Sequence, residues 1–288
     1  MKKKRLYITD LDGTLLQDDA TLSPFCRKTL QEMMSQGLQF TVASARSVFS
    51  MQDILRGLTF ELPIISINGG YISDLSTGRH HFINAIDTVV VDSLLRIIEE
   101  GGFLPWVSTF DGTRDRLYYS RLINEGMQWY LADRIEAKDV RLHHLDKLSD
   151  SLQDQVICLI VMGKEKQLAE LRETIEKKHG RQLMMQFYEN RYSPGWHWLS
   201  IHDHKANKGR ALQTLVEHWG LKDTELVVFG DAENDIDMFQ EADLAVAVSN
   251  AEATLKPFAT DIIGSNVDDS VVKYIAAEMG FLSRTYPN

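Results

Sequence analysis

The chain has 288 residues, a length typical of about two domains. It carries 31 Lys and Arg residues against 41 Asp and Glu residues, and the net charge of −10 argues against nucleic acid as a partner, because phosphate-backbone binding needs a basic surface. Its 44% hydrophobic residues fit a folded protein, and its two cysteines argue against a disulfide scaffold or a structural zinc site. No apolar run approaches the ~20 residues that span a bilayer, and the segment after Met1–Arg5 is too short and too acidic for a signal peptide. We therefore expect a cytoplasmic protein that does not bind membranes.

Short apolar runs alternate with a helical pattern in the first part of the chain, which predicts a parallel α/β sheet. Strands are expected over 6–9, 38–43 and 63–67. A helix is expected between Ser23-Pro24 and Gly37, because serine is a good N-cap, proline suits the first helical position, and glycine ends helices.

The middle of the chain has a different, α+β pattern. Helices are expected over 89–100, 123–134 and 164–179, and strands over 104–110, 117–120, 156–161, 182–188 and 196–201, with Asp111-Gly112 as a hairpin turn. The end of the chain returns to buried strands, over 225–229 and 244–248, with a helix from about 235 to 242. We interpret 85–201 as a domain inserted into a core made of 1–84 and 202–288, with boundaries defined to within several residues.

Four of the expected core strands end in polar segments. These segments are Asp10-Leu11-Asp12-Gly13-Thr14, Ser44-Ala45-Arg46, Asn68-Gly69-Gly70 and Gly230-Asp231-Ala232-Glu233-Asn234-Asp235. Ligands of an open parallel sheet bind outside the carboxyl ends of its strands, so these groups are expected to meet there. Carboxylates at close range repel one another unless a cation lies among them, and Mg²⁺ is the usual cation for oxygen ligands.

The alternating acids Asp10 and Asp12 predict two carboxylates with different chemical roles. One carboxylate can stay ionised as a nucleophile and metal ligand, while the other exchanges protons. An isolated Asp-x-Asp-Gly is more typical of a surface turn. Its place directly after a strand, together with the Gly-Asp-x-x-Asn-Asp segment after a later strand, favours the catalytic interpretation.

The segments Asp10–Thr14 and Gly230–Asp235, with Ser44 and Lys208-Gly209, resemble in order and spacing the four motifs of the haloacid dehalogenase superfamily of phosphohydrolases. The insertion resembles the class IIB cap of the Cof-type sugar-phosphatase branch. The resemblance implies a Rossmann-like parallel-sheet core with an α+β cap that selects the substrate. Two motifs depart from the usual pattern: Ser44-Ala45 stands where threonine and glycine are usual, and Ala232 where glycine is common. Neither change removes a ligand.

The resemblance also implies a role for each motif residue. Asp10 would be the nucleophile and a metal ligand, and Asp12 the general acid/base that binds Mg²⁺ through its backbone carbonyl. Asp231 would be the third metal ligand, and Asp235 would hold the metal site in place without binding the metal directly. The transferring phosphoryl group would be held by Leu11, Ser44, Ala45, Lys208 and Asn234.

Other candidates carry less weight. Trp196 or His197 could contact the leaving group of the substrate, but a strand-core role is equally compatible with the pattern. Asn68 and Gly69 could contact substrate or form only a turn. The run His202-Asp203-His204 is more typical of a structural or solvated segment than of a metal site.

The sequence thus predicts a Mg²⁺-dependent phosphomonoesterase of small phosphorylated metabolites, most of all sugar phosphates, that forms an aspartyl phosphate. Two alternatives stay open: a phosphoryl transferase such as a sugar phosphomutase, and a phosphometabolite sensor without turnover.

Overall fold

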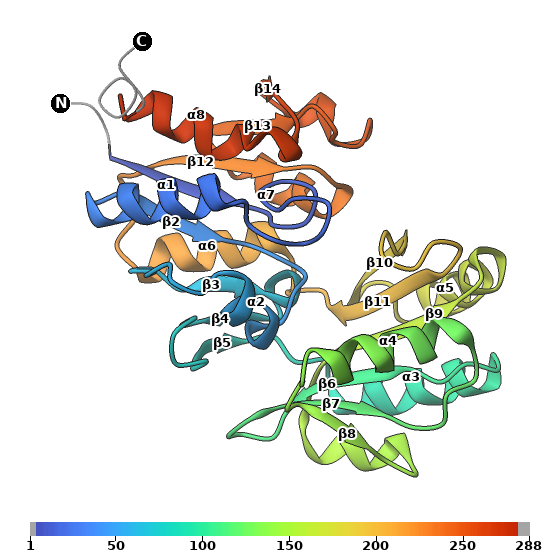
Figure 1. Cartoon of the computed structure of the whole chain (residues 1–288). Coiled ribbons are helices and arrows are strands. Elements are labelled where there is room, and N and C mark those ends of the chain that lie inside the picture. The colour runs from blue at the N-terminus through green and yellow to red at the C-terminus, as the bar shows by residue number, and fades with distance from the viewer. Residues whose placement is uncertain (1–3, 282–288) are drawn as a thin grey trace. The chain divides into compact units, whose positions relative to one another are not determined.

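The computed structural model describes residues 4–281, and the chain divides into two compact units (Figure 1). The first unit comprises Met1–Phe82 and Asn207–Asn288, and the second comprises Ile83–Ala206. A parallel-sheet unit and a separate mixed-sheet unit agree with the expected fold class.

The first unit is built on a five-stranded parallel sheet in the order β14-β13-β12-β1-β2. The strands are β1 (Arg5–Thr9), β2 (Gln39–Val42), β12 (Glu225–Gly230), β13 (Leu244–Val248) and β14 (Asp261–Ile263). The predicted strands over 6–9, 38–43, 225–229 and 244–248 are therefore confirmed. Because β1 pairs in parallel with both β2 and β12, the residues that follow these three strands emerge at one edge of the sheet.

The helices of the first unit are α1 (Pro24–Ser35), α2 (Val48–Ile54), α6 (Lys208–His218), α7 (Ile236–Gln240) and α8 (Ser270–Glu278). Three of them, α1, α2 and α6, begin at a residue whose side chain caps the helix. The Ser23 hydroxyl accepts a hydrogen bond from the Cys26 amide at 2.9 Å, as the predicted N-cap requires. The Asn207 side chain accepts one from the Arg210 amide at 2.7 Å, which fixes the start of α6 at Lys208.

The predicted strand over 63–67 was wrongly assigned to the core sheet. Residues Ile64–Ser66 form β3 in a separate three-stranded sheet with β4 (Tyr71–Ser73) and β5 (His80–Ile83). A tight 3₁₀ turn, η1 (Ile67–Gly69), reverses the chain directly after β3, so that β3 pairs with the antiparallel β4. An isolated bridge between Ala43 and Ile65 links β3 to the core sheet.

The second unit contains a six-stranded sheet in the order β10-β11-β9-β6-β7-β8. Its strands are β6 (Trp106–Phe110), β7 (Asp115–Tyr119), β8 (Leu142–His144), β9 (Gln155–Gly163), β10 (Leu183–Glu189) and β11 (His197–Asp203), and its helices are α3 (Thr88–Glu100), α4 (Glu125–Glu136) and α5 (Glu165–His179). Alternate residues along the strands build two cores. Val107 and Leu199 join the core with α3 and α5, whereas Trp106 and Trp198 join the core with α4. All predicted elements of this region are present to within a few residues.

Several elements of the fold were not predicted or differ in extent. The strands β4, β5, β8 and β14 were missed, because each has only three or four residues and gives no clear periodicity, and the helices α2 and α8 were not predicted. The expected helix over 235–242 is the short α7, preceded by the 3₁₀ turn η3 (Glu233–Asp235).

Among residues 4–281, no helix combines the length and the apolar character needed to cross a bilayer.

Candidate active site

Three carboxylates meet at the carboxyl ends of β1 and β12. Asp10 follows β1 directly, Asp231 follows β12 directly, and Asp235 ends η3. One oxygen from each lies within 4.8 Å of the other two, and all three residues are buried. The parallel pairing of β1 with β12 causes this convergence, because it aligns Thr9 with Phe229 and so places the two following segments side by side.

Lys208 lies between two of these acids. Its Nζ donates hydrogen bonds to Asp10 Oδ1 and Asp235 Oδ1, each at 2.7 Å, and its side chain is fully buried. Lys205, the other lysine near the start of α6, is exposed. The N-cap at Asn207 places Lys208 at the first position of α6 and so directs it into the cluster.

Burial and the charges of the cluster shift the pKa values of both Asp10 and Lys208. Burial raises the pKa of Asp10 well above its ordinary value; Lys208 opposes that rise, and the neighbouring acids Asp235, Asp231 and Asp12 reinforce it. Burial alone would lower the pKa of Lys208, but the charges and hydrogen bonds of Asp10 and Asp235 outweigh burial, so that its pKa is raised. Lys208 therefore stays protonated.

The donor set fits a divalent cation. Three buried carboxylates and one ammonium leave two formal negative charges uncompensated among these four groups when all are ionised. Oxygen ligands of this kind suit Mg²⁺, and a dication would restore the local balance of charge. The cluster could therefore hold Mg²⁺ through Asp10 and Asp231.

Asp235 is tied mainly to its own loop. Its Oδ2 accepts hydrogen bonds from the amides of Asp231 and Ala232 at 3.0 and 3.2 Å, while its Oδ1 accepts from Lys208. A Cβ on Gly230 would lie 2.6 Å from Asp235 Oδ2, so only glycine lets this carboxylate fold back over the strand end. Asp235 therefore orders the loop that presents Asp231.

Two hydroxyls lie on the segments that follow β1 and β2. Thr14 Oγ1 donates to Asp231 Oδ1 at 3.0 Å, and sequence reasoning gave Thr14 no role although it belongs to the first motif. Ser44 is buried, and its Oγ accepts a hydrogen bond from the Arg46 amide at 3.2 Å. Of the other predicted phosphate-binding positions, Leu11 is buried and Ala45 is exposed.

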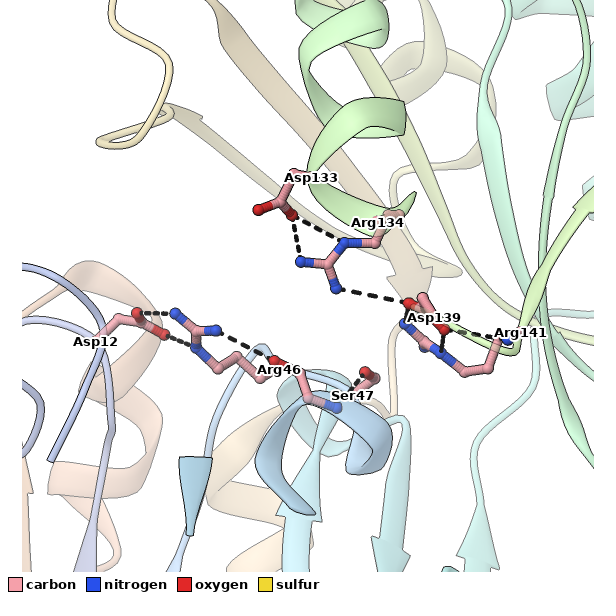
Figure 2. A network of polar contacts seen from close by, with 8 residues as sticks. Asp12, Arg46, Ser47, Asp133, Arg134, Asp139 and Arg141 are labelled. Carbon is pink, nitrogen blue, oxygen red and sulfur yellow. Dashed lines mark hydrogen bonds and ion pairs between the residues drawn. The ribbon is translucent and has the colours of Figure 1, made fainter. Parts of the chain in front are cut away.

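The carboxylate of Asp12 faces the guanidinium of Arg46 (Figure 2). Arg46 Nε donates to Asp12 Oδ2 at 2.7 Å and Arg46 Nη2 donates to Asp12 Oδ1 at 2.6 Å, a bidentate pair. Sequence reasoning missed this role of Arg46, and the available signal was an arginine two residues after Ser44 on a loop already expected beside Asp12. The pair fixes the orientation of the Asp12 carboxylate.

A second polar network in Figure 2 belongs to the inserted unit. Arg134 pairs with Asp133 and Asp139, and Arg141 donates to Asp139 at 2.6 Å. These ion pairs connect the end of α4 to the start of β8.

The residues predicted to contact substrate make close contacts within their own units. Asn68 is buried, and its Oδ1 accepts a hydrogen bond from Asn234 Nδ2 at 3.1 Å. Trp196 packs on Gly126 and lies under the Lys164 ammonium, which is 3.7 Å from its ring centroid. The His197 ring lies 5.4 Å from the Phe187 ring. A contact of these residues with substrate stays a prediction.

His202 is a buried structural residue, one of the two outcomes expected for the His202-Asp203-His204 run. Its Nε2 lies 3.7 Å from Cys158 Sγ on the neighbouring strand. Burial lowers the pKa of His202 to about 4 and raises the pKa of Cys158 to about 12. Both groups are therefore uncharged at neutral pH.

Comparison with known proteins identifies the family. A family model described as haloacid dehalogenase-like hydrolase matches residues 7–275. The chain is 25% identical over 276 residues to the 5-amino-6-(5-phospho-D-ribitylamino)uracil phosphatase YitU of Bacillus subtilis (strain 168), covering 95% of this chain and 97% of that protein. It shares its fold with a haloacid dehalogenase-like hydrolase from Bacteroides thetaiotaomicron (TM-score 0.79, 22% identity, covering 96% of this chain and 100% of that one). It also shares its fold with the subclass IIB sugar phosphatase BT4131 (TM-score 0.73, 19% identity, covering 96% and 100%). The chain therefore belongs to the haloacid dehalogenase-like hydrolase family.

Proposed function

We propose that this protein is a Mg²⁺-dependent phosphomonoesterase that hydrolyses small phosphorylated metabolites through an aspartyl phosphate on Asp10. One observation carries the proposal: the buried Asp10 carboxylate is held by Lys208 at 2.7 Å and shares one cluster with Asp231. A nucleophilic carboxylate needs a fixed orientation and nearby positive charge, because the phosphoryl group it attacks is itself anionic.

The first step transfers the phosphoryl group to the enzyme. An oxygen of Asp10 attacks phosphorus, the bond from phosphorus to the ester oxygen breaks, and Asp12 gives its proton to the leaving alkoxide. Mg²⁺ bound by Asp10, Asp231 and the backbone carbonyl of Asp12 would supply positive charge against the phosphoryl oxygens. Lys208 adds a fixed charge, which stabilises the transition state without reorganisation.

The second step releases phosphate. Asp12 takes a proton from water, the water oxygen attacks phosphorus, and the bond to Asp10 breaks. The hydroxyl of Ser44, the amides of Leu11 and Ala45, and the side chain of Asn234 hold the phosphoryl oxygens in both steps. Before substrate binds, both oxygens of the Asp12 carboxylate accept hydrogen bonds from Arg46, so Asp12 leaves this pair and takes up a proton from solvent before it protonates the leaving alkoxide.

The substrate we propose is a phosphate ester of a sugar or sugar alcohol. YitU is named for a phosphorylated ribityl compound, and BT4131 is named a sugar phosphatase. Both names describe a phosphate on a polyhydroxylated carbon chain, and this shared chemistry is what we propose for the present chain. We further propose that the unit Ile83–Ala206 acts as the cap that selects the leaving group, with Trp196 and His197 as candidate contacts.

Hydrolysis assays test this function. Phosphate release is measured from p-nitrophenyl phosphate and from a panel of sugar, sugar-alcohol and nucleoside monophosphates, including 5-amino-6-(5-phospho-D-ribitylamino)uracil. We expect turnover that EDTA abolishes, that Mg²⁺ restores, and that Asp10→Asn removes. Turnover that persists in EDTA or in Asp10→Asn would contradict the proposal.

The two alternatives give different products in the same assay. A phosphoryl transferase would move the phosphoryl group to an added sugar in preference to water. A sensor would bind the ester without releasing phosphate. The presence of Asp12 favours a hydrolase over a sensor, because binding alone does not require an acid/base.

A further inference from the structure

Three consecutive residues after β3 have left-handed backbone conformations. The φ angles are +48° at Ile67, +54° at Asn68 and +94° at Gly69. Asparagine and glycine tolerate this region, but a β-branched residue such as isoleucine rarely adopts it. All three residues are buried. Strain of this kind persists only where surrounding contacts impose it, and it is concentrated at functional sites.

The turn is hydrogen-bonded to the loop that carries Ser44. The Asn68 amide donates to the Ser44 carbonyl and the Ile67 amide donates to the Arg46 carbonyl, each at 3.0 Å. These two bonds lie on either side of Ala45. They fix the backbone that presents the Ser44 hydroxyl and the Ala45 amide.

The turn also holds the side chain of Asn234. Asn68 Oδ1 accepts a hydrogen bond from Asn234 Nδ2 at 3.1 Å. An amide group has two N–H donors, so this bond occupies one of them and fixes the direction of the other. Asn234 follows β12, 166 residues further along the chain.

The third contact is with the start of α6. A Cβ placed on Gly69 would lie 2.5 Å from the Asn207 carbonyl oxygen, so only glycine allows the two backbones to approach this closely. Asn207 is the N-cap of α6, and the next residue is Lys208. The position of Gly69 therefore sets where the Lys208 ammonium enters the cluster.

We propose that the strained turn Ile67–Asn68–Gly69 is a positioning element that sets the relative geometry of three phosphate-binding segments: the Ser44 loop, the Asn234 amide and the Lys208 helix start. The proposal rests on the phosphatase function proposed above. It gives Asn68 and Gly69 a role through other residues, since their described contacts are with Ser44, Asn234 and Asn207. The left-handed backbone is what lets one short turn reach all three.

A mutant cycle tests the part of the proposal that concerns Asn68. Asn68→Gly keeps the left-handed backbone and removes the acceptor for Asn234. Binding of inorganic phosphate in the presence of Mg²⁺ is measured by calorimetry, with kcat and KM measured on a substrate found in the panel. We expect Asn68→Gly to raise the dissociation constant and KM about tenfold, as the loss of one hydrogen bond predicts. Its thermal unfolding midpoint should change by only a few degrees.

The double variant decides how Asn68 acts. If Asn68 acts by orienting Asn234, adding Asn68→Gly to Asn234→Ala should raise the phosphate dissociation constant no further. Additive effects of the two changes, or an unchanged constant in Asn68→Gly alone, would overturn this part of the proposal.

The close approach at Gly69 has a matched control. Gly57 also has a left-handed backbone (φ +88°), but a Cβ there would meet nothing within 4 Å. We expect Gly57→Ala to leave kcat and phosphate binding unchanged, and Gly69→Ala to lower kcat about a hundredfold by displacing Lys208. Equal kinetics in the two variants would overturn the role of Gly69.

The phosphate-binding measurement separates this proposal from the proposed function. A protein that binds phosphate but hydrolyses no ester would refute the phosphatase, and the mutant cycle would still report on the turn. A working phosphatase with an additive cycle would refute the positioning role alone.

Discussion

Replacing Lys208 by methionine tests how strongly the buried ion-pair cluster depends on its one ammonium. Lys208→Met keeps the length and apolar stem of the side chain but leaves Asp10 and Asp235 facing each other without their cation. Two charge-assisted hydrogen bonds of 2.7 Å are lost, each worth about 1.5–3 kcal/mol. Removal of one partner from a buried pair costs about 3–5 kcal/mol, so the two estimates agree.

Urea unfolding followed by tryptophan fluorescence measures this loss, with Lys205→Met as the control because Lys205 is exposed. We expect Lys208→Met to lower the free energy of unfolding by about 3–5 kcal/mol and the thermal midpoint by roughly 6–20 °C. Lys205→Met should change the free energy by less than about 0.5 kcal/mol.

The pH dependence gives an independent check. The pKa of Asp10 is raised in the folded protein, so the stability associated with its protonation is present at low pH and is lost as pH rises through the folded pKa. Without Lys208 that pKa should rise further, and the cost of Lys208→Met should be smaller at pH 5 than at pH 8. A loss under about 1 kcal/mol at pH 8, or a loss that grows toward low pH, would refute the description of this cluster.

Three further predictions follow from the site and the inserted unit. Asp12→Asn should lower kcat by about 10²–10⁴-fold in phosphate-release assays, because it removes the acid/base, and an activity within tenfold of the native enzyme would contradict that role. Mg²⁺ at about 100 times its dissociation constant should stabilise the protein by about 2.7 kcal/mol in thermal unfolding, an effect that should disappear in Asp231→Asn. Burial lowers the pKa of His202 to about 4 from an ordinary 6.5, so stability should fall by about 3 kcal/mol as pH drops from 6.5 to 4. His202→Leu should flatten that part of the urea-unfolding profile, and an unchanged slope would show that His202 does not titrate as described.

The sheet that carries the site was predictable because buried parallel strands read as continuous apolar runs. The apolar run Leu6–Thr9 predicts β1, and Asp10 follows it directly. The apolar run of β12 is likewise followed by Asp231, so the sequence indicates each strand and the acid at its end. Parallel pairing then brings the ends together without any further information. In the structure, Asp10 and Asp231 meet at the ends of these strands, and Lys208 binds Asp10 there.

The features that the sequence did not reveal depend on contacts between distant segments. The bond between Asn68 and Asn234 joins residues 166 positions apart, and the pair of Arg46 with Asp12 joins residues 34 positions apart. No local pattern specifies such partners. The short strands β4 and β5 were missed because tertiary pairing, and not periodicity, determines strands of three or four residues.

Chemical trapping of the enzyme during turnover tests the central claim most directly. The protein is mixed with substrate and Mg²⁺, quenched in acid within milliseconds, reduced with borohydride and digested for mass spectrometry. The account predicts that Asp10, and no other residue, is reduced to homoserine, and that the product is absent from Asp10→Asn. Full turnover with no modified residue, or reduction at a different carboxylate, would contradict the claim that Asp10 accepts the phosphoryl group.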